Sequence, residues 1–431
     1  MIRIFCFSIL LLISSSCSSK NSLQIDGEIA DKPEIKTAIE TKTVVKTGIE
    51  VLRDNNFDIL KGKKVGLITN PTGIDSKFRS TIDILFHAED VNLVALFAPE
   101  HGVRGNMDAG ARVANSTDNI TGVPVYSIYG KTNRPTAEML ENIDVLVYDI
   151  QDIGCRSYTF ISTMGLAMKS AAENGVDFVV LDRPNPLGGE KIEGNVVEDG
   201  CYSFVSQFSI PYIYGQTPGE LAQMLNEENY LGKKCNLTVV KMEGWQRSMN
   251  WEATGLPWVP ASPHIPHAET AFYYPATGIL GELGYINIGV GYTMPFQTVA
   301  APWINADSLS IALNDMQMVG VYFRPTHYKP MYSAHSGSYC SGVQIYITDF
   351  AKVRLTEIQF RIMEALNILY PSRATLANAN SGRFAMFDKV CGSKYIRATF
   401  TENHRWADIK DFFEKDEAEY KVKSSKYYLY E

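Results

Sequence analysis

The first half of the chain carries five short, uninterrupted apolar runs, and this feature constrains the fold more than any other. The runs occupy residues 65–69, 92–98, 123–128, 145–149 and 178–181. Uninterrupted apolar runs of this length are typical of strands that are buried on both faces, as in parallel sheets. Stretches with helical character lie between them, at residues 80–87, 136–142 and 159–174. This alternation predicts an α/β domain with a doubly wound sheet over residues 47–215.

The second half has a different pattern and predicts a smaller α+β domain over residues 216–431. Its elements are expected at residues 218–226 (helix), 237–242 (strand), 344–348 (strand) and from Leu355 onward (helix). A segment rich in Trp and Pro and then a glycine-rich stretch separate the two expected strands, at residues 245–275 and 278–291. We place the boundary between the two domains near Gly215.

The N-terminus has the features of an export signal. Arg3 precedes an apolar run at residues 4–13, and three serines then lead to Cys17. The run is shorter than the ~20 residues that span a bilayer, and it fits the apolar region of a signal peptide. We interpret residues 1–17 as a signal peptide with a lipobox-like cysteine that becomes lipidated, which predicts an exported protein on the periplasmic face of a bacterial membrane. The alternative is an ordinary signal peptide with an incidental cysteine. Residues 18–46 are polar and predict a flexible tether.

Charge and cysteine content limit the partners of the chain. The formal net charge is −8, which argues against a nucleic-acid partner because phosphate binding needs a basic face. Five cysteines follow Cys17 at wide spacings, without a C-x-x-C pair, so neither a zinc ribbon nor a thioredoxin-type site is predicted. The sequence also lacks a G-x-G-x-x-G after the first run, a Walker motif and a G-x-S-x-G elbow. We therefore predict no cofactor and no metal.

Polar residues cluster where three of the predicted strands end. Glu100 and His101 follow the second run, residues 149–158 follow the fourth, and residues 182–186 follow the fifth. Ligands of doubly wound sheets bind beyond the carboxyl ends of the strands. The three loops are therefore expected to converge on one rim and to form a binding site there.

Carboxyl groups in these loops are the candidate catalytic groups. Glu100 lies just past a buried strand, where partial desolvation raises a carboxyl pKa toward the range of a general acid. Its alternative role is to cap or fix its own loop. Asp149 and Asp152 are candidates for a second carboxylate, as a base or a stabiliser, and the alternative is an internal Asp–Arg ion pair that shapes the loop.

Further polar and aromatic side chains are the candidates for ligand binding. Arginine forks match carboxylates in a bidentate way, so Arg104 and Arg183 are candidates for an anionic ligand. The candidates in or next to the strand-end loops are His101, Gln151, Arg156, Tyr158, Asp182 and Asn185, and those of the glycine-rich stretch are Glu282 and Tyr292. The pair His264 and His267 has the spacing H-x-x-H, but two prolines break the helix on which a metal site of this kind is built.

Several long motifs, in this order, resemble the exo-β-N-acetylmuramidase family. They are A-P-E-H-G-V-R-G, V-Y-D-I-Q-D-I-G-C-R-S-Y-T-F, L-D-R-P-N-P-L-G-G, G-L-P-W-V-P-A-S-P-H-I-P and Y-P-A-T-G-I-L-G-E-L. The resemblance covers about residues 47–431. It implies a Rossmann-like N-terminal domain, a smaller C-terminal domain and a cleft between them. It also implies release of terminal β-linked N-acetylmuramic acid from the non-reducing ends of peptidoglycan fragments, with Glu100 of the E-H-G motif as the catalytic residue.

The implied substrate extends these expectations. Its lactyl carboxylate calls for a cation, and Arg104, Arg156 or Arg183 is the expected partner. Glu100 would protonate the leaving oxygen, with Asp149 or Asp152 as the second group, while retention, inversion and assistance by the N-acetyl group all stay open. Two other functions remain as alternatives: a cell-wall-binding lipoprotein without catalysis, and a hydrolase of another peptidoglycan bond. No oligomeric state is predicted.

Overall fold

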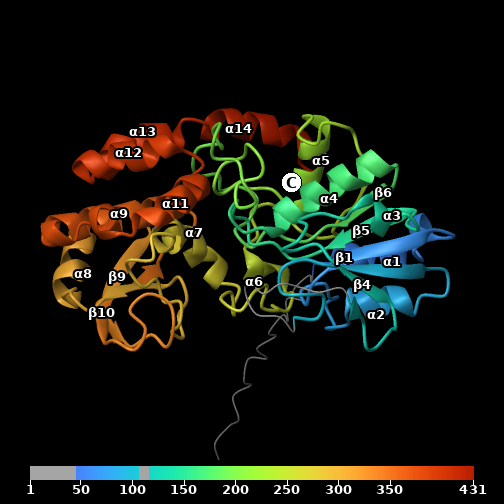
Figure 1. The fold of residues 1–431 in the computed structure, drawn as a ribbon, viewed down its shortest axis with the longest axis horizontal. Helices are drawn as coiled ribbons and strands as arrows, with labels where there is room; N and C mark the ends of the chain where they lie inside the picture. The colour runs from blue at the N-terminus through green and yellow to red at the C-terminus, as the bar shows by residue number, and fades with distance from the viewer. Residues whose placement is uncertain (1–44, 106–115) are drawn as a thin grey trace, which may run out of the picture. The chain divides into compact units, whose positions relative to one another are not determined.

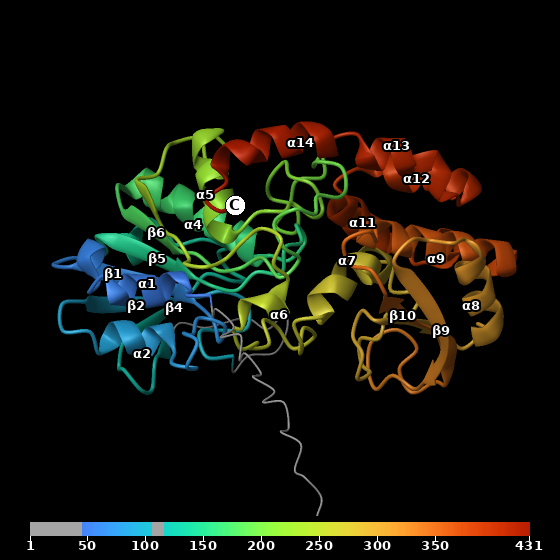
Figure 2. The ribbon, with the colours of Figure 1, turned by 180° about the vertical axis from the view of Figure 1, so that it is seen from behind.

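The computed structural model describes residues 45–105 and 116–431, which belong to one compact unit. Figures 1 and 2 show this unit from two sides. The expected signal peptide with Cys17, and the expected tether up to residue 44, lie outside the described residues. Within the two described ranges, none of the helices has the length and apolar character that crossing a membrane requires.

A seven-stranded sheet forms the core of the first half. Its strands are β1 (Lys64–Thr69), β2 (Asn92–Ala98), β3 (Ser116–Thr117), β4 (Pro124–Ser127), β5 (Val145–Asp149), β6 (Asp177–Leu181) and β7 (Leu237–Val240). The strand order is β3-β4-β2-β1-β5-β6-β7, and every pair is parallel except β3 with β4. The predicted α/β fold with a doubly wound sheet is confirmed.

Helices cover both faces of this sheet, which explains why its strands are apolar without interruption. The helices are α1 (Gly48–Asp54), α2 (Thr81–Phe86), α3 (Ala137–Leu140), α4 (Phe160–Asn174) and α5 (Pro218–Glu227). In β5, Val145 and Val147 face the cluster that includes α1 and α2, whereas Leu146 and Tyr148 face the cluster that includes α4 and α5. Alternate side chains of one strand are therefore buried on opposite faces.

The large sheet continues past the expected domain boundary at Gly215. Helix α5 begins there with a capping box, in which Thr217 and Glu220 satisfy each other's backbone N–H groups. The chain then adds β7 to the edge of the sheet beside β6. Hence the architecture of the first half extends to at least Val240.

The second half is built on a small antiparallel sheet of the order β8-β10-β9. Its strands are β8 (Thr298–Ala301), β9 (Val321–Tyr328) and β10 (Cys340–Ile347). Among its helices, α7 (Thr270–Gly281) and α9 (Leu355–Leu369) pack against each other, and α8 (Ala306–Asp315) covers the sheet beside them. The remaining helices are α6 (Trp251–Thr254), α10 (Thr375–Asn378), α11 (Phe384–Cys391), α12 (Lys394–Asn403), α13 (Trp406–Glu414) and α14 (Glu417–Ser424).

The two halves share one hydrophobic core, and the C-terminal tail links them a second time. One continuous cluster of buried residues includes both α4 and α9. Helix α14 leads back to the large sheet, next to α5 (Figure 1). There the Tyr430 hydroxyl donates to Asp182 at 2.6 Å, and the Leu429 backbone N–H donates to Glu220 at 2.9 Å. The two halves are therefore packed against each other, and the C-terminal tail adds a second connection between them.

Candidate functional site

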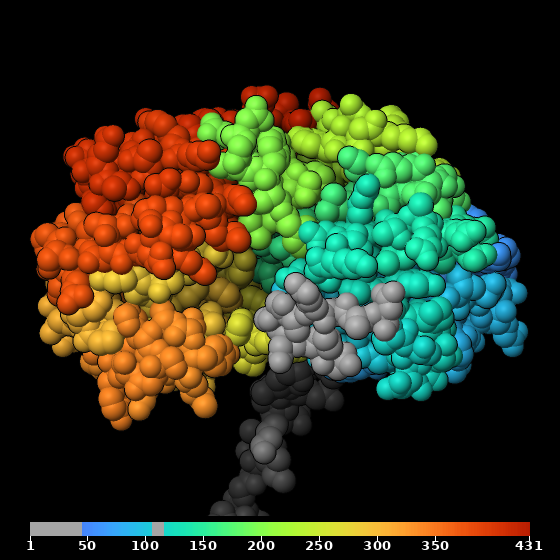
Figure 3. Space-filling model, in the orientation of Figure 1, coloured from blue at the N-terminus to red at the C-terminus, as the bar shows by residue number. Residues whose placement is uncertain are grey.

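A cavity of about 440 Å³ lies between the two halves of the chain. This volume falls in the range of small-molecule sites. The first half contributes loops that follow β2, β4, β5 and β6. The second half contributes the segment before α7, α7 itself, the glycine-rich stretch after it and the loop between β9 and β10. In Figure 3 the cyan and green first half and the orange and red second half meet near the middle of the view. The predicted cleft is therefore present.

Glu100 lies in the wall of this cavity, immediately after β2. The Tyr129 hydroxyl donates to one of its carboxylate oxygens at 2.9 Å, and the Thr159 hydroxyl donates to the other at 3.4 Å. Burial and the charge of Glu100 raise the pKa of Tyr129 to about 12, so this hydroxyl keeps its proton at neutral pH. The carboxyl group is thus oriented by groups from the loops after β4 and β5.

Glu282 is a second carboxylate in the same cavity and comes from the other half. It follows the last residue of α7. Burial raises its pKa, and the nearby Arg383, whose guanidinium lies 3.6 Å from the carboxylate, partly opposes that shift. Burial likewise raises the pKa of Tyr274, and the charges of both Glu282 and Glu100 contribute to it. The two carboxylates therefore face a common space beside the Tyr274 hydroxyl.

Two histidines also line the cavity. His101 is 7% exposed and has a backbone φ of +73°, a backbone conformation that residues other than glycine rarely adopt. Its Nδ1 atom is buried without a hydrogen-bond partner among the described residues. The Nε2 atom of His264 lies 3.1 Å from the Tyr332 hydroxyl. Burial lowers the pKa of His264, and the charge of His101 adds to this effect, so the two rings influence each other electrostatically.

Aromatic rings form one side of the cavity. The rings of Tyr158 and Tyr274 meet edge to face with centroids 5.8 Å apart, and Tyr274 meets Phe296 at 4.8 Å. The Ser157 hydroxyl lies 3.2 Å from the Tyr274 hydroxyl and donates to Tyr212 at 3.0 Å. An apolar wall with a few hydroxyl groups suits a sugar ring, which has apolar C–H faces and polar edges.

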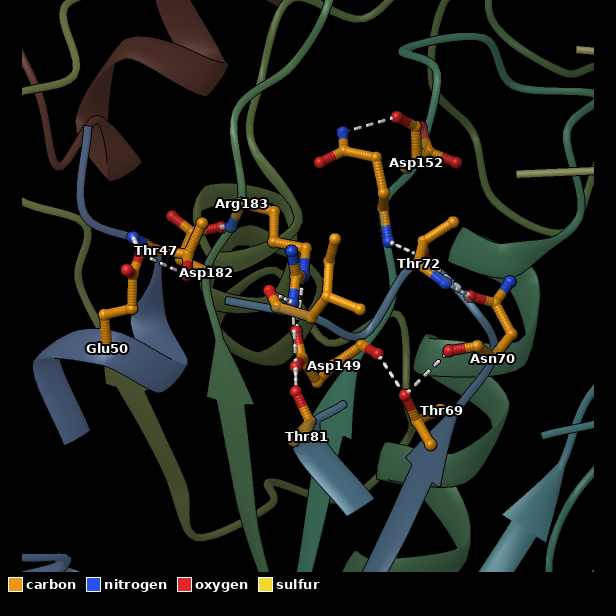
Figure 4. Close-up of polar contacts among 12 residues, drawn as sticks. Thr47, Glu50, Thr69, Asn70, Thr72, Thr81, Asp149, Asp152, Asp182 and Arg183 are labelled. Carbon is orange, nitrogen blue, oxygen red and sulfur yellow. Dashed lines mark hydrogen bonds and ion pairs between the residues drawn. The ribbon is translucent and has the colours of Figure 1, made fainter. Parts of the chain in front are cut away.

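Asp149 and Asp152 lie outside this cavity, which corrects the expectation that one of them is the second catalytic carboxylate. Asp149 is fully buried and accepts from the Arg183 guanidinium at 2.5 and 2.9 Å and from the Thr81 hydroxyl at 2.5 Å (Figure 4). Asp152 accepts from the Tyr214 hydroxyl and, at 2.7 Å, from the Gly154 backbone N–H. For Asp149, the alternative of an internal Asp–Arg ion pair is confirmed.

The three arginines expected to bind a ligand carboxylate are engaged inside the protein. Arg104 pairs with Asp118 at 2.6 Å and with Asp83 at 3.0 Å. Arg156 is fully buried and donates to three backbone carbonyls, at 2.6 to 3.0 Å. Arg183 pairs with Asp149. None of the three lines the cavity, and the described residues that line it include no lysine or arginine.

The other predicted residues divide into two groups. His101, Tyr158 and Glu282 line the cavity as expected. By contrast, four residues make internal contacts instead: Gln151 donates to two carbonyls, Asp182 accepts from Thr217 and Tyr430, Asn185 bonds the Gln216 carbonyl, and Tyr292 stacks on Tyr328. Asp182 and Asn185, which directly follow β6, therefore support the site from outside the cavity, whereas Phe204 and Val205 of the same connection line it.

The crevice at the carboxyl ends of β1 and β5 is filled by protein. A chain that winds in both directions from β1 leaves its usual ligand crevice at this point. Here the Trp251 and Trp258 rings, 4.8 Å apart, help to close it, and the remaining cavity measures about 10 Å³. The cavity therefore lies beside this crevice, at the carboxyl ends of β2 and β4.

Sequence reasoning missed Tyr129, Tyr274 and the role of His264 as a lining residue. Tyr129 follows the third apolar run, and the rule that placed Glu100 also applies to this strand end. Tyr274 is the first residue of the motif Y-P-A-T-G-I-L-G-E-L, from which only the family resemblance was inferred. His264 was considered only as a metal ligand, and within the described ranges no group of three or more His, Cys, Asp or Glu side chains is arranged to hold a metal ion.

Comparison with known proteins shows similarity along almost the whole described chain. The family models for the N-terminal and C-terminal domains of exo-β-N-acetylmuramidase NamZ match residues 65–269 and 272–430. The peptidoglycan β-N-acetylmuramidase NamZ of Bacillus subtilis is 43% identical over 398 residues, which cover 92% of this chain and 94% of that protein.

Two crystal structures of DUF1343 family proteins from Bacteroides fragilis share the fold. The first is 59% identical with a TM-score of 0.87, and the second is 26% identical with a TM-score of 0.71. Each comparison covers 90% of this chain and 99% of the solved chain.

Proposed function

Because this chain belongs to the exo-β-N-acetylmuramidase NamZ family, we propose that it is a glycoside hydrolase that releases N-acetylmuramic acid from the non-reducing ends of peptidoglycan fragments. The observation that carries the proposal is a cavity of single-ligand size with Glu100 and Glu282 in its walls. Most glycosidases use two carboxyl groups beside the scissile bond. A cavity of this size, rather than an open groove, favours cleavage at a chain end.

Glu100 acts as the general acid in this proposal. Its two carboxylate oxygens accept hydrogen bonds from Tyr129 and Thr159, so the group has a defined orientation at the cavity wall. A positioned acid protonates the leaving oxygen as the glycosidic bond breaks, and such proton transfer typically contributes ~10²–10⁴-fold in rate.

Glu282 takes the role that sequence reasoning gave to Asp149 or Asp152. Its carboxylate comes from the opposite half of the chain, and within residues 45–105 and 116–431 it forms one ion pair, with Arg383, at 3.6 Å. It is therefore available to stabilise positive charge at the sugar or to activate water. The first anomer formed, read by proton NMR, narrows the role: inversion indicates a base, whereas retention indicates a carboxylate nucleophile or assistance by the N-acetyl group.

Sugar release tests the proposal. The protein is incubated with N-acetylmuramic acid β-linked to N-acetylglucosamine, and products are followed by mass spectrometry. We expect free N-acetylmuramic acid, with the rate reduced ~10²–10⁴-fold in Glu100→Gln. Glu138→Gln, on the exposed side of α3, is the matched control and is expected to behave as the wild type.

Other outcomes select other functions. Binding of the disaccharide without cleavage would indicate a cell-wall-binding protein. Release of peptide or acetate without free sugar would indicate a hydrolase of another bond. Near-normal turnover by Glu100→Gln would remove this residue from the acid role, and normal turnover by Glu282→Gln would assign its role to the N-acetyl group of the substrate.

We also propose that the protein is exported and anchored through a lipid on Cys17, on the periplasmic face. The apolar run before the cysteine and the polar segment after it support this proposal. Fractionation of cells tests it: the wild-type protein is expected in the membrane fraction and Cys17→Ser in the soluble exported fraction. Equal membrane association of the two would contradict lipidation.

A further inference from the structure

We propose that His101 and His264 together bind the lactyl carboxylate of N-acetylmuramic acid and thereby determine specificity for this sugar. The inference rests on the proposed function and assigns its specificity to two residues. N-Acetylglucosamine lacks the lactyl group, so a pair of groups that bind the carboxylate would separate the two sugars.

The first observation is the unmet hydrogen-bonding capacity of His101. This side chain is almost completely buried in the cavity wall, beside the proposed acid Glu100, and its Nδ1 atom has no partner among the described residues. A buried nitrogen without a partner is costly in a folded protein. The backbone of His101 also adopts a left-handed conformation, and such strain concentrates at functional sites. A ligand oxygen at Nδ1 would satisfy this atom.

The second observation is the way in which His264 is held. It lines the cavity from the other half of the chain, and its Nε2 atom lies 3.1 Å from the Tyr332 hydroxyl. When Tyr332 donates this hydrogen bond, the proton of a neutral imidazole sits on Nδ1. The ring then presents an N–H group on the side away from Tyr332, and it can donate to an anion.

The third observation is the charge of the cavity. Two glutamates face the space between the histidines and the aromatic wall, whereas the tyrosines there, Tyr129, Tyr158 and Tyr274, have raised pKa values and stay neutral. The described lining contributes no permanent cation, and the three arginines once expected to bind the carboxylate are paired elsewhere. An anionic sugar in a partly desolvated site needs an opposite charge. The two histidines are the lining groups that can acquire one.

Binding is therefore expected to take up a proton. Burial and the neighbouring His101 lower the pKa of His264 in the free protein, which favours its neutral form. A carboxylate placed against the two rings favours the charged form and raises their pKa values. Preference for the acidic sugar, measured as kcat/KM, should accordingly decline as the pH rises through the lowered pKa of His264 in the free protein, which lies below the ~6.5 of an unperturbed histidine.

A comparison of two substrates tests the inference. One is an aryl β-glycoside of N-acetylmuramic acid, and the other is its lactyl methyl ester, which has the same size but no charge. The ratio of their kcat/KM values, acid over ester, is measured against pH for the full-length protein. Because Glu100 and Glu282 serve both substrates, their titration cancels in this ratio.

The wild-type ratio is expected to be highest at acidic pH and to fall through the range in which histidine loses its proton. In His101→Gln and His264→Gln the ratio should fall roughly 10- to 100-fold, the size of one lost charge-assisted hydrogen bond, because the acid loses more than the ester. Tyr332→Phe should cause a smaller decrease, and His87→Gln, at an exposed position, should cause none. A flat pH profile, or unchanged ratios in both histidine variants, would overturn the inference.

Calorimetry separates this inference from the proposed function. Free N-acetylmuramic acid is titrated into the protein in two buffers of different ionisation enthalpy, which counts the protons taken up. Proton uptake that is lost in the double histidine variant supports the inference even if the protein cleaves neither glycoside. Binding without proton uptake, or with the same uptake in the double variant, contradicts it whether or not the protein is a hydrolase.

Discussion

Two groups of polar residues lie at the carboxyl ends of the same sheet, and they differ in whether their carboxylates are buried inside the protein or line the cavity. The first group surrounds Asp149 and Arg183, in the crevice beside β1 and β5, where each charge meets an internal partner (Figure 4). The second surrounds Glu100, which accepts hydrogen bonds from the neutral hydroxyls of Tyr129 and Thr159. Both groups come from strand-end loops, and each contains a carboxylate.

The difference teaches how to distinguish a structural polar cluster from a site. A buried carboxylate held by an arginine and a threonine has used its hydrogen-bonding capacity, so it fixes loop geometry and has none left for a ligand. A carboxyl group that lines a cavity, as Glu100 does, can still reach a substrate there. Mutations in the group around Asp149 should therefore change stability, whereas mutations in the group around Glu100 should change activity.

The largest effect on stability is expected from Asp149→Ala. This change leaves the Arg183 guanidinium buried without its counter-charge, and removal of one partner of a buried pair typically costs ~3–5 kcal/mol. Urea unfolding followed by circular dichroism measures the loss. Glu100→Gln is the matched comparison and is expected to unfold near the wild-type midpoint. Equal destabilisation by the two changes would break the distinction.

Asp152 is expected to make stability depend on pH. Burial raises its pKa from 3.8 to about 6, so the folded protein holds this proton more tightly than the unfolded chain. The contribution therefore favours folding at low pH and is lost as the pH rises from about 4 to about 6, by up to ~3 kcal/mol. The free energy of unfolding of Asp152→Asn should show a weaker decrease over this window. The exposed control Asp411→Asn should keep the wild-type decrease. If the free energy of unfolding of Asp152→Asn fell with pH as steeply as that of this control, the prediction would be wrong.

Tyr129→Phe is expected to have a moderate effect that is confined to activity. The change removes one hydrogen bond to Glu100 and leaves the ring in place, so kcat should fall about tenfold, in line with the loss of one bond to a charged group. Steady-state kinetics on an aryl glycoside measures it. The sharper readout is the alkaline limb of the pH–rate profile, because a general acid must be protonated to act. Loss of the donor destabilises the ionised carboxylate and should move this limb to higher pH. A rate loss without any such shift would indicate that Tyr129 only fills space.

Arg104→Gln should have the smallest effect on activity. Its pair with Asp83 is partly exposed and contributes ~0–1 kcal/mol, whereas Asp118 is buried, so any loss of stability comes mainly from that carboxylate. The KM for the acidic sugar should remain at the wild-type value because this arginine lies outside the cavity. A large increase in KM for the acid but not for its ester would return Arg104 to the role of ligand cation.

Sequence reasoning was most successful where local pattern decides structure. The five apolar runs correspond to β1, β2, β4, β5 and β6, because a strand covered on both faces must be apolar throughout. Glu100 was also found, since it directly follows such a strand. The second half was harder to predict: α7 contains Pro275, and β9 contains Pro325 and has exposed residues on both faces, Tyr322 and His327, so neither shows a clean period.

The partners of charged side chains could not be predicted, because those partners are distant in sequence. Asp149 meets an arginine 34 positions away, and Arg156 bonds the Val390 carbonyl 234 positions away. Residue type and sequence spacing identify an arginine that can bind an anionic ligand. They do not show whether another part of the protein already supplies the acceptor that this arginine binds. For the same reason Glu282 was ranked below Asp149 and Asp152, although it shares a cavity with Glu100.

By itself, the sequence determined the doubly wound sheet, the position of Glu100 at a strand end and the family to which the motifs point, because each depends on residues close together in the chain. Only the tertiary structure decided which polar groups face the cavity. Trp251 and Trp258 close the crevice beside β1, and the second half brings Glu282 and His264 opposite Glu100 and His101. The physical reason is that charge pairing and burial depend on distances between remote segments, which are set by the packing of the two halves.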